Sequence, residues 1–223
     1  MSGSASKRQL IINAAQAVFS DVGFDRARVS DIARKAGVAD GTIYLYFKSK
    51  DELLISLFEE RVLPMMKAIE GAVAEGPQDP RGRLASLVQA YIDAMEENPS
   101  LGSIITMQVR QSRRFVTDYD NRPLARFFGG IGEIVQAGQA QGMFRRDLHI
   151  DTLRWMIFGA LDAFTLSWGL GHSSDADLSR MGDELVQLLL RGLGSGEFQT
   201  MMPSPAEAPA AALPPETFDP ALD

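Results

Sequence analysis

Apolar side chains recur every three to four positions along most of this chain, a spacing that places them on one face of an α-helix. The first such face spans residues 10–19, and Gly23 follows it as a helix stop. A second, short helix is expected from Val29 to Ala36 and a third from Asp40 to Phe47. A tight turn around Gly37 joins these two, because glycine readily adopts the left-handed conformation that such a turn requires.

A fourth helix is expected to begin at Ser49. The run Ser49-Lys50-Asp51-Glu52 matches a capping box, in which Ser49 caps the helix and Glu52 reaches back. Pro64 is expected to kink this helix or to lie at an interruption. Further helical segments follow at roughly 81–97, 99–115, 120–141, 150–171 and 175–193. No convincing alternation with the period of two that marks strands is present, so the pattern predicts an all-α protein of about nine helices.

The composition changes after residue 195. Six prolines stand among alanines and acidic residues between Met201 and Asp223. A segment of this kind does not bury enough apolar surface to fold by itself. We therefore expect residues 196–223 to form a disordered tail, of which the part from Met201 onward is dispensable for function.

The overall composition narrows the class of protein. The 223 residues are 45% hydrophobic and 23% charged, as is typical of a globular protein. The chain has no cysteine, which excludes disulfides, thiolate metal ligands and cysteine nucleophiles. It shows no signal peptide and no uninterrupted run of about 20 apolar residues that would span a membrane. We expect a cytoplasmic protein without membrane contact, metal or cofactor.

Charge is distributed unevenly along the chain. The net charge is −7, but residues 1–50 contain eight lysines and arginines against four aspartates, or +4. The other 173 residues therefore carry −11. Extending the first part to include Asp51 and Glu52 halves its positive charge. A basic head on an acidic body indicates that only the head contacts nucleic-acid phosphates.

The second and third helices have the spacing of a helix-turn-helix DNA-binding motif. In the third helix, Ile43 and Phe47 share the buried face, and the residues around them remain available outside. Tyrosine hydroxyls there donate to phosphate oxygens, and Gly41 lets the backbone approach a base edge. The alternative from spacing alone is a small three-helix core with a solvated basic face.

Residues 29–54, VSDIARKAGVADGTIYLYFKSKDELL, closely resemble the DNA-binding signature of the TetR family of repressors. The chain length and the nine-helix layout agree with that family. The resemblance implies a homodimeric repressor that binds a palindromic double-stranded DNA operator and leaves it when a small hydrophobic effector binds. It also implies that Thr42 and Leu45 approach bases, whereas Tyr44, Tyr46 and Lys50 hold phosphates. The predicted DNA-binding residues are Arg28, Asp40, Gly41, Thr42, Tyr44, Leu45, Tyr46, Lys48 and Lys50.

Two positions depart from the family pattern. Serine or threonine often caps the second and third helices, and here Arg28 and Ala39 stand at those places. Arg28 is a poor cap but is able to pair with a phosphate. Asp40 suits the positive end of the recognition helix dipole. Next to DNA it either repels phosphate or accepts from a cytosine amino group, and both interpretations stay open.

The body resembles the fatty-acid-degradation repressors of the TetR family in three blocks, namely residues 37–62, residues 109–112 and residues 153–168. This resemblance implies that long-chain acyl-CoA is the effector. An acyl chain requires an apolar channel between helices, and the CoA phosphates require basic residues at its mouth. The predicted effector-binding residues are Met66, Ile69, Leu87, Tyr91, Ile104, Met107, Arg110, Arg114, Phe127, Phe128, Ile131, Trp155 and Phe158. The alternatives are a plain apolar core and a solvated arginine-bearing helix face.

The last two helices carry surplus apolar residues at helical spacing, as in the four-helix contact of an obligate homodimer. The predicted dimer-interface residues are Phe164, Trp168, Leu185, Leu188 and Leu189. The alternative is that these side chains fill the core of one protomer.

The chain shows no sign of an enzyme. His149 and His172 are the only histidines, and neither has a metal-ligand spacing. No nucleophile-elbow or nucleotide-binding motif is present. Two alternatives to the acyl-CoA-responsive repressor remain. One is a ligand-binding or assembly protein with a vestigial helix-turn-helix, and the other is a TetR-like repressor of efflux or another pathway with a different hydrophobic ligand. The domains expected are 1–48 for DNA binding, 49–195 for ligand binding and dimerisation, and the 196–223 tail.

Overall fold

Three N-terminal helices form the head of the molecule, and their bounds follow the apolar pattern closely. The computed structural model describes residues 2–105, 112, 122–169 and 178–195. Within these residues α1 spans Ser2–Val22, α2 spans Val29–Ala36 and α3 spans Asp40–Tyr46. Gly37 ends α2 in the left-handed conformation with φ of 69°, as expected from its place in the turn. Phe19, Ile32 and Phe47 are buried where the three helices meet.

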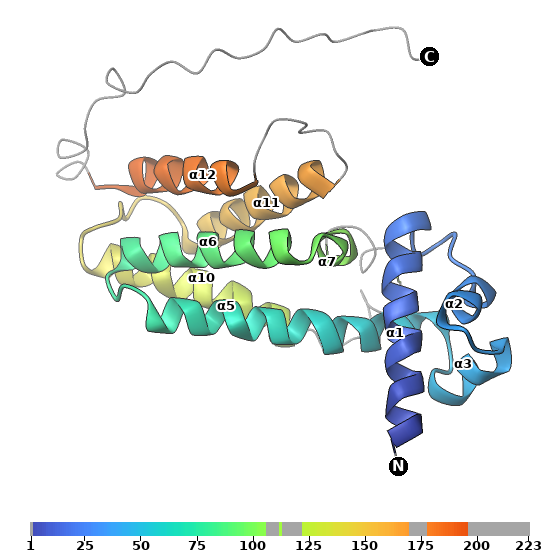
Figure 1. Cartoon of the computed structure of the whole chain (residues 1–223). Coiled ribbons are helices and arrows are strands. Elements are labelled where there is room, and N and C mark those ends of the chain that lie inside the picture. The colour runs from blue at the N-terminus through green and yellow to red at the C-terminus, as the bar shows by residue number, and fades with distance from the viewer. Residues whose placement is uncertain (1, 106–111, 113–121, 170–177, 196–223) are drawn as a thin grey trace, which may run out of the picture.

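A long, nearly continuous helix leads from the head into the body (Figure 1). It consists of α4 (Lys50–Leu57), the π-helical turn η1 (Phe58–Val62) and α5 (Leu63–Glu75). Pro64 explains the change of winding, because proline has no N–H for the Glu60 carbonyl and its ring would collide with that carbonyl in a regular α-helix. The wider π turn just before Pro64 accommodates the ring. The interruption expected at Pro64 is therefore confirmed.

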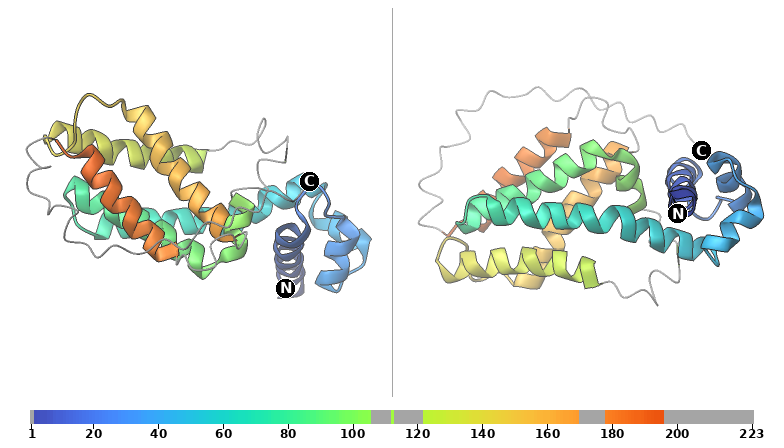
Figure 2. Two further views of the ribbon diagram at one scale, coloured as in Figure 1. Left: turned by 90° about the horizontal axis from the view of Figure 1, so that it is seen from above. Right: turned by 60° about the horizontal axis from the view of Figure 1, so that its bottom comes forward.

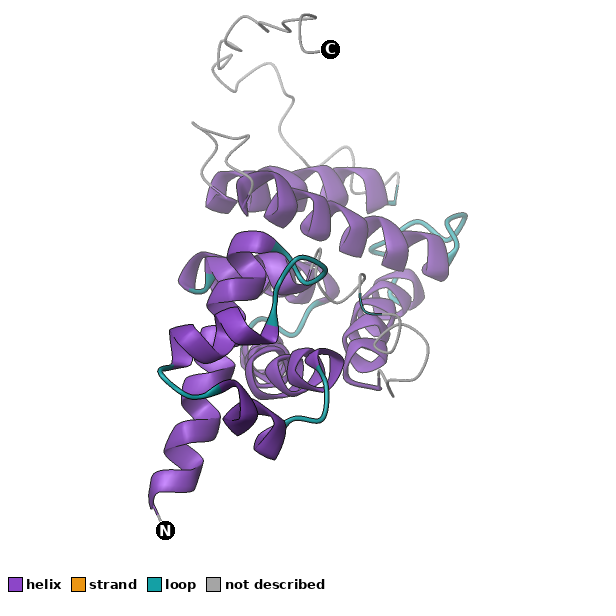
Figure 3. Ribbon diagram, turned by 90° about the vertical axis from the view of Figure 1, so that its right-hand side faces the viewer, coloured by secondary structure: helices purple, strands orange, loops and turns teal. Residues whose placement is uncertain are grey.

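The body is a bundle of helices packed around this connector. It contains α6 (Pro80–Glu97), α7 (Pro99–Ser103), α10 (Arg122–Ala140), α11 (Ile150–Gly169) and α12 (Leu178–Leu193). α5 packs against α6 and α10, while α12 packs against α6 and α11. The two views of Figure 2 show the head at one end of α5 and the bundle along the rest of it. In Figure 3 the described part of the chain is helix joined by loops.

Counting α4, η1 and α5 as one helix, the described residues form nine helices, and the all-α prediction is confirmed. The predicted 99–115 helix begins at Pro99, but residues 106–111 and 113–115 lie outside the described part. The predicted tail at 196–223 also lies outside it. None of the described helices is long and apolar enough to cross a membrane.

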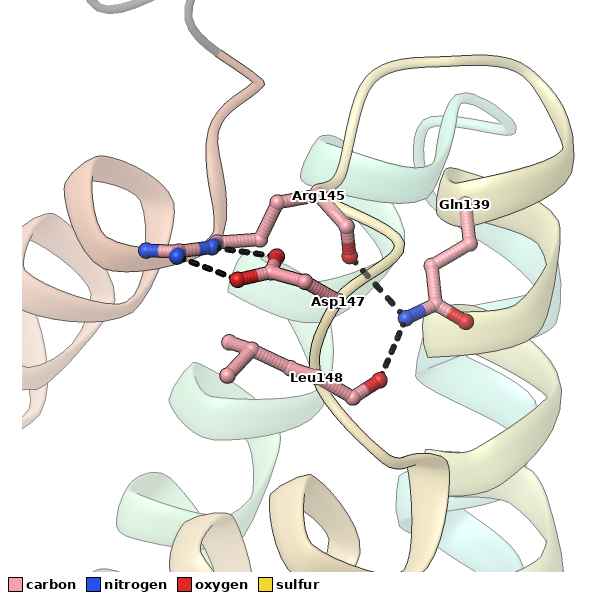
Figure 4. Close-up of polar contacts among 4 residues, drawn as sticks. All are labelled: Gln139, Arg145, Asp147 and Leu148. Carbon is pink, nitrogen blue, oxygen red and sulfur yellow. Dashed lines mark hydrogen bonds and ion pairs between the residues drawn. The ribbon is translucent and has the colours of Figure 1, made fainter.

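The loop between α10 and α11 is fixed by contacts of both backbone and side chains. Phe144 forms an isolated antiparallel bridge with Gly194 after α12. Its ring lies where a side chain on Gly138 would have to be, 2.0 Å from the position of a Cβ there. Gln139 Nε2 donates to the carbonyls of Arg145 and Leu148, at 3.0 and 2.9 Å (Figure 4). This loop therefore ties the end of α10 to the end of α12.

Candidate DNA-binding surface and effector cavity

The recognition helix α3 presents large side chains to solvent on a rigid support. Ile43 and Phe47 are each 2% exposed and anchor the helix, as expected. Leu45 is 82% exposed and Tyr44 is 57% exposed. Both side chains are therefore largely accessible to solvent, and their contact with DNA stays a prediction.

The other predicted DNA-binding residues also lie on or next to α3. Gly41, Asp40, Lys48 and Arg28 are exposed, whereas Thr42 and Tyr46 are partly buried. The ring of Tyr46 packs 6.5 Å from that of Phe47, between centroids. The structure therefore gathers the predicted set on one region of the head, with Tyr46 the least accessible of its aromatic members.

Helix caps agree with the sequence analysis. Neither Arg28 before α2 nor Ala39 before α3 makes a side-chain cap hydrogen bond. At α4, the Ser49 hydroxyl accepts from the Glu52 N–H at 3.1 Å. The Glu52 carboxylate reaches back to accept from the Lys48 N–H at 2.7 Å. The cap at Ser49 is confirmed, although Glu52 bonds one residue further back than in the standard capping box.

Lys50 has a role that the sequence analysis missed. Its ammonium donates to the carbonyls of Phe24, Asp25 and Ala27, at 2.7, 3.2 and 3.2 Å. It also lies 4.5 Å from the centre of the Phe24 ring. An ammonium group has three hydrogens, and all three have acceptors here. A phosphate contact by Lys50 stays a prediction, and it competes with this clamp on the loop between α1 and α2.

Further contacts join the head to the connector and the body. Arg8 of α1 forms an ion pair with Glu60 of η1, and its guanidinium lies 5.2 Å from the Phe47 ring centre. Gln16 Nε2 of α1 donates to Ser100 Oγ of α7 at 2.6 Å. The head is thus attached to the rest of the molecule at η1 and at α7.

A cavity of about 250 Å³ lies between α5, α6 and α10. It is lined by Ile69, Glu70, Val73, Ala74, Arg83, Leu87, Arg126, Phe127, Gly130, Glu133 and Ile134. Its apolar members are largely buried, while Arg126 and Glu133 are exposed. The cavity therefore combines an apolar interior with a charged rim.

The predicted effector-binding residues are placed in four ways. Ile69, Leu87 and Phe127 line the cavity. Five others are buried in the protein core without lining it, namely Met66, Tyr91, Ile104, Ile131 and Phe158. Phe128 and Trp155 pack on each other outside the cavity, with ring centroids 4.8 Å apart, and Trp155 is 62% exposed. Met107, Arg110 and Arg114 lie outside the described residues.

Trp155 is the clearest difference from the prediction. Apolar spacing along residues 150–171 marks a helix but does not tell which neighbour covers each of its sides. Arg83 and Arg126 line the cavity without having been predicted to do so, and they lie 43 positions apart on different helices. Only the packing of α6 against α10 brings them to one cavity, so no local signal identified them.

The predicted dimer residues separate into an inner and an outer set. Leu185 is 6% exposed and therefore belongs to the core of the protomer. Leu188, one turn away on α12, is 68% exposed. Phe164, Trp168 and Leu189 are partly buried.

Comparison with known proteins gives matches over nearly the whole described chain. A family model described as bacterial regulatory proteins, tetR family, matches residues 11–57, and one described as the C-terminal region of YsiA-like protein matches residues 58–192. The fatty acid metabolism regulator protein of Bacillus subtilis is 30% identical over 187 residues, which cover 84% of this chain and 95% of that protein.

Solved structures agree. The fatty acid degradation regulator FadR of Bacillus halodurans has a TM-score of 0.73 and 34% identity, over 86% of this chain and 98% of that one. FadR of Bacillus subtilis, in complex with stearoyl-CoA, has a TM-score of 0.72 and 30% identity, over 83% and 98%. The two family models together cover head and body, and the chain therefore belongs to the TetR family of bacterial regulatory proteins.

Proposed function

We propose that this protein is a homodimeric transcriptional repressor that binds a palindromic operator through α3 and is released from it by long-chain acyl-CoA. One observation carries the effector assignment. A relative that is 30% identical over 83% of this chain has been solved with stearoyl-CoA, and this chain has an apolar cavity with arginines at its rim. We propose that the protein acts by binding alone, as its relatives that are transcriptional regulators do, and that it is not an enzyme.

DNA reading rests on the exposed side of α3. Leu45 and Thr42 meet base edges, since apolar and hydroxyl groups contact thymine methyls and base acceptors in the major groove. Tyr44, Tyr46, Lys48 and Arg28 contact phosphates, which fix the register of the helix on the duplex. Asp40 lies in the first turn of α3, where it either accepts from a cytosine amino group or repels phosphate.

Dimerisation follows from the limited reach of one recognition helix. A single α3 covers only a few base pairs, so useful specificity requires two-fold repetition. α11 exposes Met156, Gly159 and Ala163 at helical spacing, and α12 exposes Leu188. Small residues allow two helices to approach closely, which favours a four-helix contact between protomers.

The effector acts through the connector helix. Ile69 and Val73 of α5 line the cavity, and α5 continues through η1 into α4, which follows the recognition helix in the chain and packs against α1. The cavity of about 250 Å³ is smaller than the roughly 300–1,000 Å³ that ligand pockets usually have. A long acyl chain therefore displaces its walls, including α5, when it enters. Release of DNA requires only that the ligand bind the displaced state more tightly.

An operator titration tests this function. Bound DNA is first selected from genomic fragments, and its affinity is then measured by fluorescence anisotropy with and without saturating palmitoyl-CoA. We expect operator affinity to fall by roughly 5- to 150-fold, the usual range for allosteric coupling. Free CoA serves as the control and should change nothing. A fragment selection without enrichment would refute the DNA-binding role, and an operator affinity independent of palmitoyl-CoA would refute the effector.

A further inference from the structure

The rim of the effector cavity carries four charged side chains from three helices. Arg83 comes from α6, Arg126 and Glu133 come from α10, and Glu70 comes from α5. Within the described part of the chain, none of the four forms a hydrogen bond or an ion pair. Both guanidinium groups are therefore available to a ligand, although two carboxylates border the same cavity.

The interior of the cavity differs sharply from this rim. Ile69, Val73, Leu87, Phe127 and Ile134 line it, and each is less than 9% exposed. An apolar chain is stabilised there, because it leaves water for an apolar environment. A polar head does not fit among these side chains without losing its hydrogen bonds to water. The cavity thus suits an amphiphile whose head stays at the rim.

Two arginines select the charge of that head. The guanidinium group donates in a planar fork that matches carboxylate and phosphate oxygens. Arg83 reaches the cavity from α6 and Arg126 from α10, so an anionic head at the rim meets guanidinium groups from two helices. Glu70 and Glu133 oppose an anion at the same place and reduce its affinity. Loss of an acidic rim charge should therefore raise the affinity for an anion, whereas loss of an arginine charge should lower it.

We propose that Arg83 and Arg126 bind the anionic head of an amphiphilic effector whose apolar chain occupies the cavity between α5, α6 and α10. This inference rests on the proposed function and adds the residues that recognise the head. The anionic oxygens belong either to the phosphates of an acyl-CoA or to the carboxylate of a free fatty acid. The two sources share the same chemistry at the arginines.

Calorimetric titration of the full chain with palmitoyl-CoA, palmitate and the neutral 1-monopalmitoylglycerol tests this proposal. We expect Arg83→Gln and Arg126→Gln each to weaken palmitoyl-CoA binding by about 3- to 10-fold, as is reasonable for partly exposed ionic contacts. Glu133→Gln should strengthen it, and binding of the neutral lipid should stay unchanged in all three variants. Lys67→Gln, an equal change of charge on the exposed side of α5, is the matched control.

The arms of the experiment separate the sources of the anion. A loss of affinity for palmitate alone assigns the arginines to a carboxylate next to the chain, while a loss for palmitoyl-CoA alone assigns them to its phosphates. A loss for both ligands means that the arginines bind the anion of either one. Unchanged affinity for both palmitoyl-CoA and palmitate in both arginine variants would overturn the inference and leave the proposed effector intact, as would an equal loss for the neutral lipid. Absence of all binding to the unaltered protein would refute the effector itself.

Discussion

The Ser112 hydroxyl donates a hydrogen bond of 2.6 Å to Asp51 Oδ1, and Ser112 is completely buried. Asp51 lies in the first turn of α4, between the Ser49 cap and Glu52 and directly after the Lys50 clamp. This hydrogen bond thus fixes Ser112 of the body to the first turn of α4, where Lys50 holds the loop between α1 and α2. A displacement of the body at this point would be transmitted to the head, because the hydrogen bond is short and shielded from water.

Loss of this hydrogen bond is expected to weaken allosteric coupling. Ser112→Ala should leave operator affinity without ligand within about two-fold of the unaltered protein. It should bring the ratio of dissociation constants with and without palmitoyl-CoA closer to one, since the head then follows the body less closely. Anisotropy titrations at zero and saturating ligand measure this ratio.

Ser179→Ala is the matched control for this change. Ser179 donates to Glu96 at 3.1 Å and joins α12 to α6 within the body, away from the head. We expect it to leave the ratio unchanged. An unaltered ratio in Ser112→Ala, with the same melting temperature as the unaltered protein, would contradict the role given to the Ser112 hydroxyl.

Local sequence signals were sufficient for most of the fold. Gly37 and the Ser49 cap set helix ends through the backbone of their immediate neighbours, so the bounds of α2 and the start of α4 could be predicted. The role of Lys50 could not, because its three carbonyl partners lie 23–26 positions away in the sequence. Arg83 and Arg126 were missed for the same reason, since only tertiary packing brings them together.

Lys48 and Lys50 are expected to respond differently to loss of charge. Lys48 is exposed, so Lys48→Gln should weaken operator binding about evenly across sequences and reduce the salt slope by roughly one unit. Lys50→Gln should leave three carbonyls without their donor and lower the melting temperature. Its salt slope should stay close to that of the unaltered protein. A slope reduced by one unit in Lys50→Gln, with no change in melting temperature, would assign Lys50 to a phosphate instead.

Substitutions of Leu45 and Ile43 should affect DNA binding and stability separately, although both residues belong to the same short helix. Leu45 is 82% exposed, so Leu45→Ala should change the free energy of unfolding by less than about 0.5 kcal/mol. It should weaken operator binding by about 10-fold, because a leucine contact with DNA is lost. Ile43→Ala creates a cavity under α3 and should cost about 2–5 kcal/mol of stability. Urea unfolding and anisotropy on the same samples measure both, and equal operator affinity in Leu45→Ala would remove this residue from the DNA contact.

An ion pair in the loop between α10 and α11 is expected to make the stability of the protein depend slightly on pH. Arg145 Nε donates to Asp147 Oδ1 at 2.7 Å, and this hydrogen bond lowers the pKa of the Asp147 carboxyl in the folded state (Figure 4). The resulting stabilisation is present above the ordinary pKa of 3.8 and is lost as the pH falls through the lower folded value. The pair is exposed, so salt should reduce the effect. Asp147→Asn should therefore lower the melting temperature slightly at neutral pH and flatten its decrease in acid, and parallel curves would contradict this.

Leu188 offers a clean test of the dimer that operator binding requires. It is 68% exposed on α12, whereas Leu185 is buried in the protomer, so a charge at Leu185 would unfold the protein before it reported on assembly. In a two-fold contact each residue meets the same surface of the partner, so Leu188→Glu introduces its charge twice. We expect a folded monomer at micromolar concentration in sedimentation velocity, with operator affinity reduced at least 100-fold because only one recognition helix then engages DNA. Lys67→Glu, an exposed change on α5, should remain dimeric. A stable monomer of the unaltered protein at that concentration would refute the dimer outright, and a dimeric Leu188→Glu would place the contact on another face.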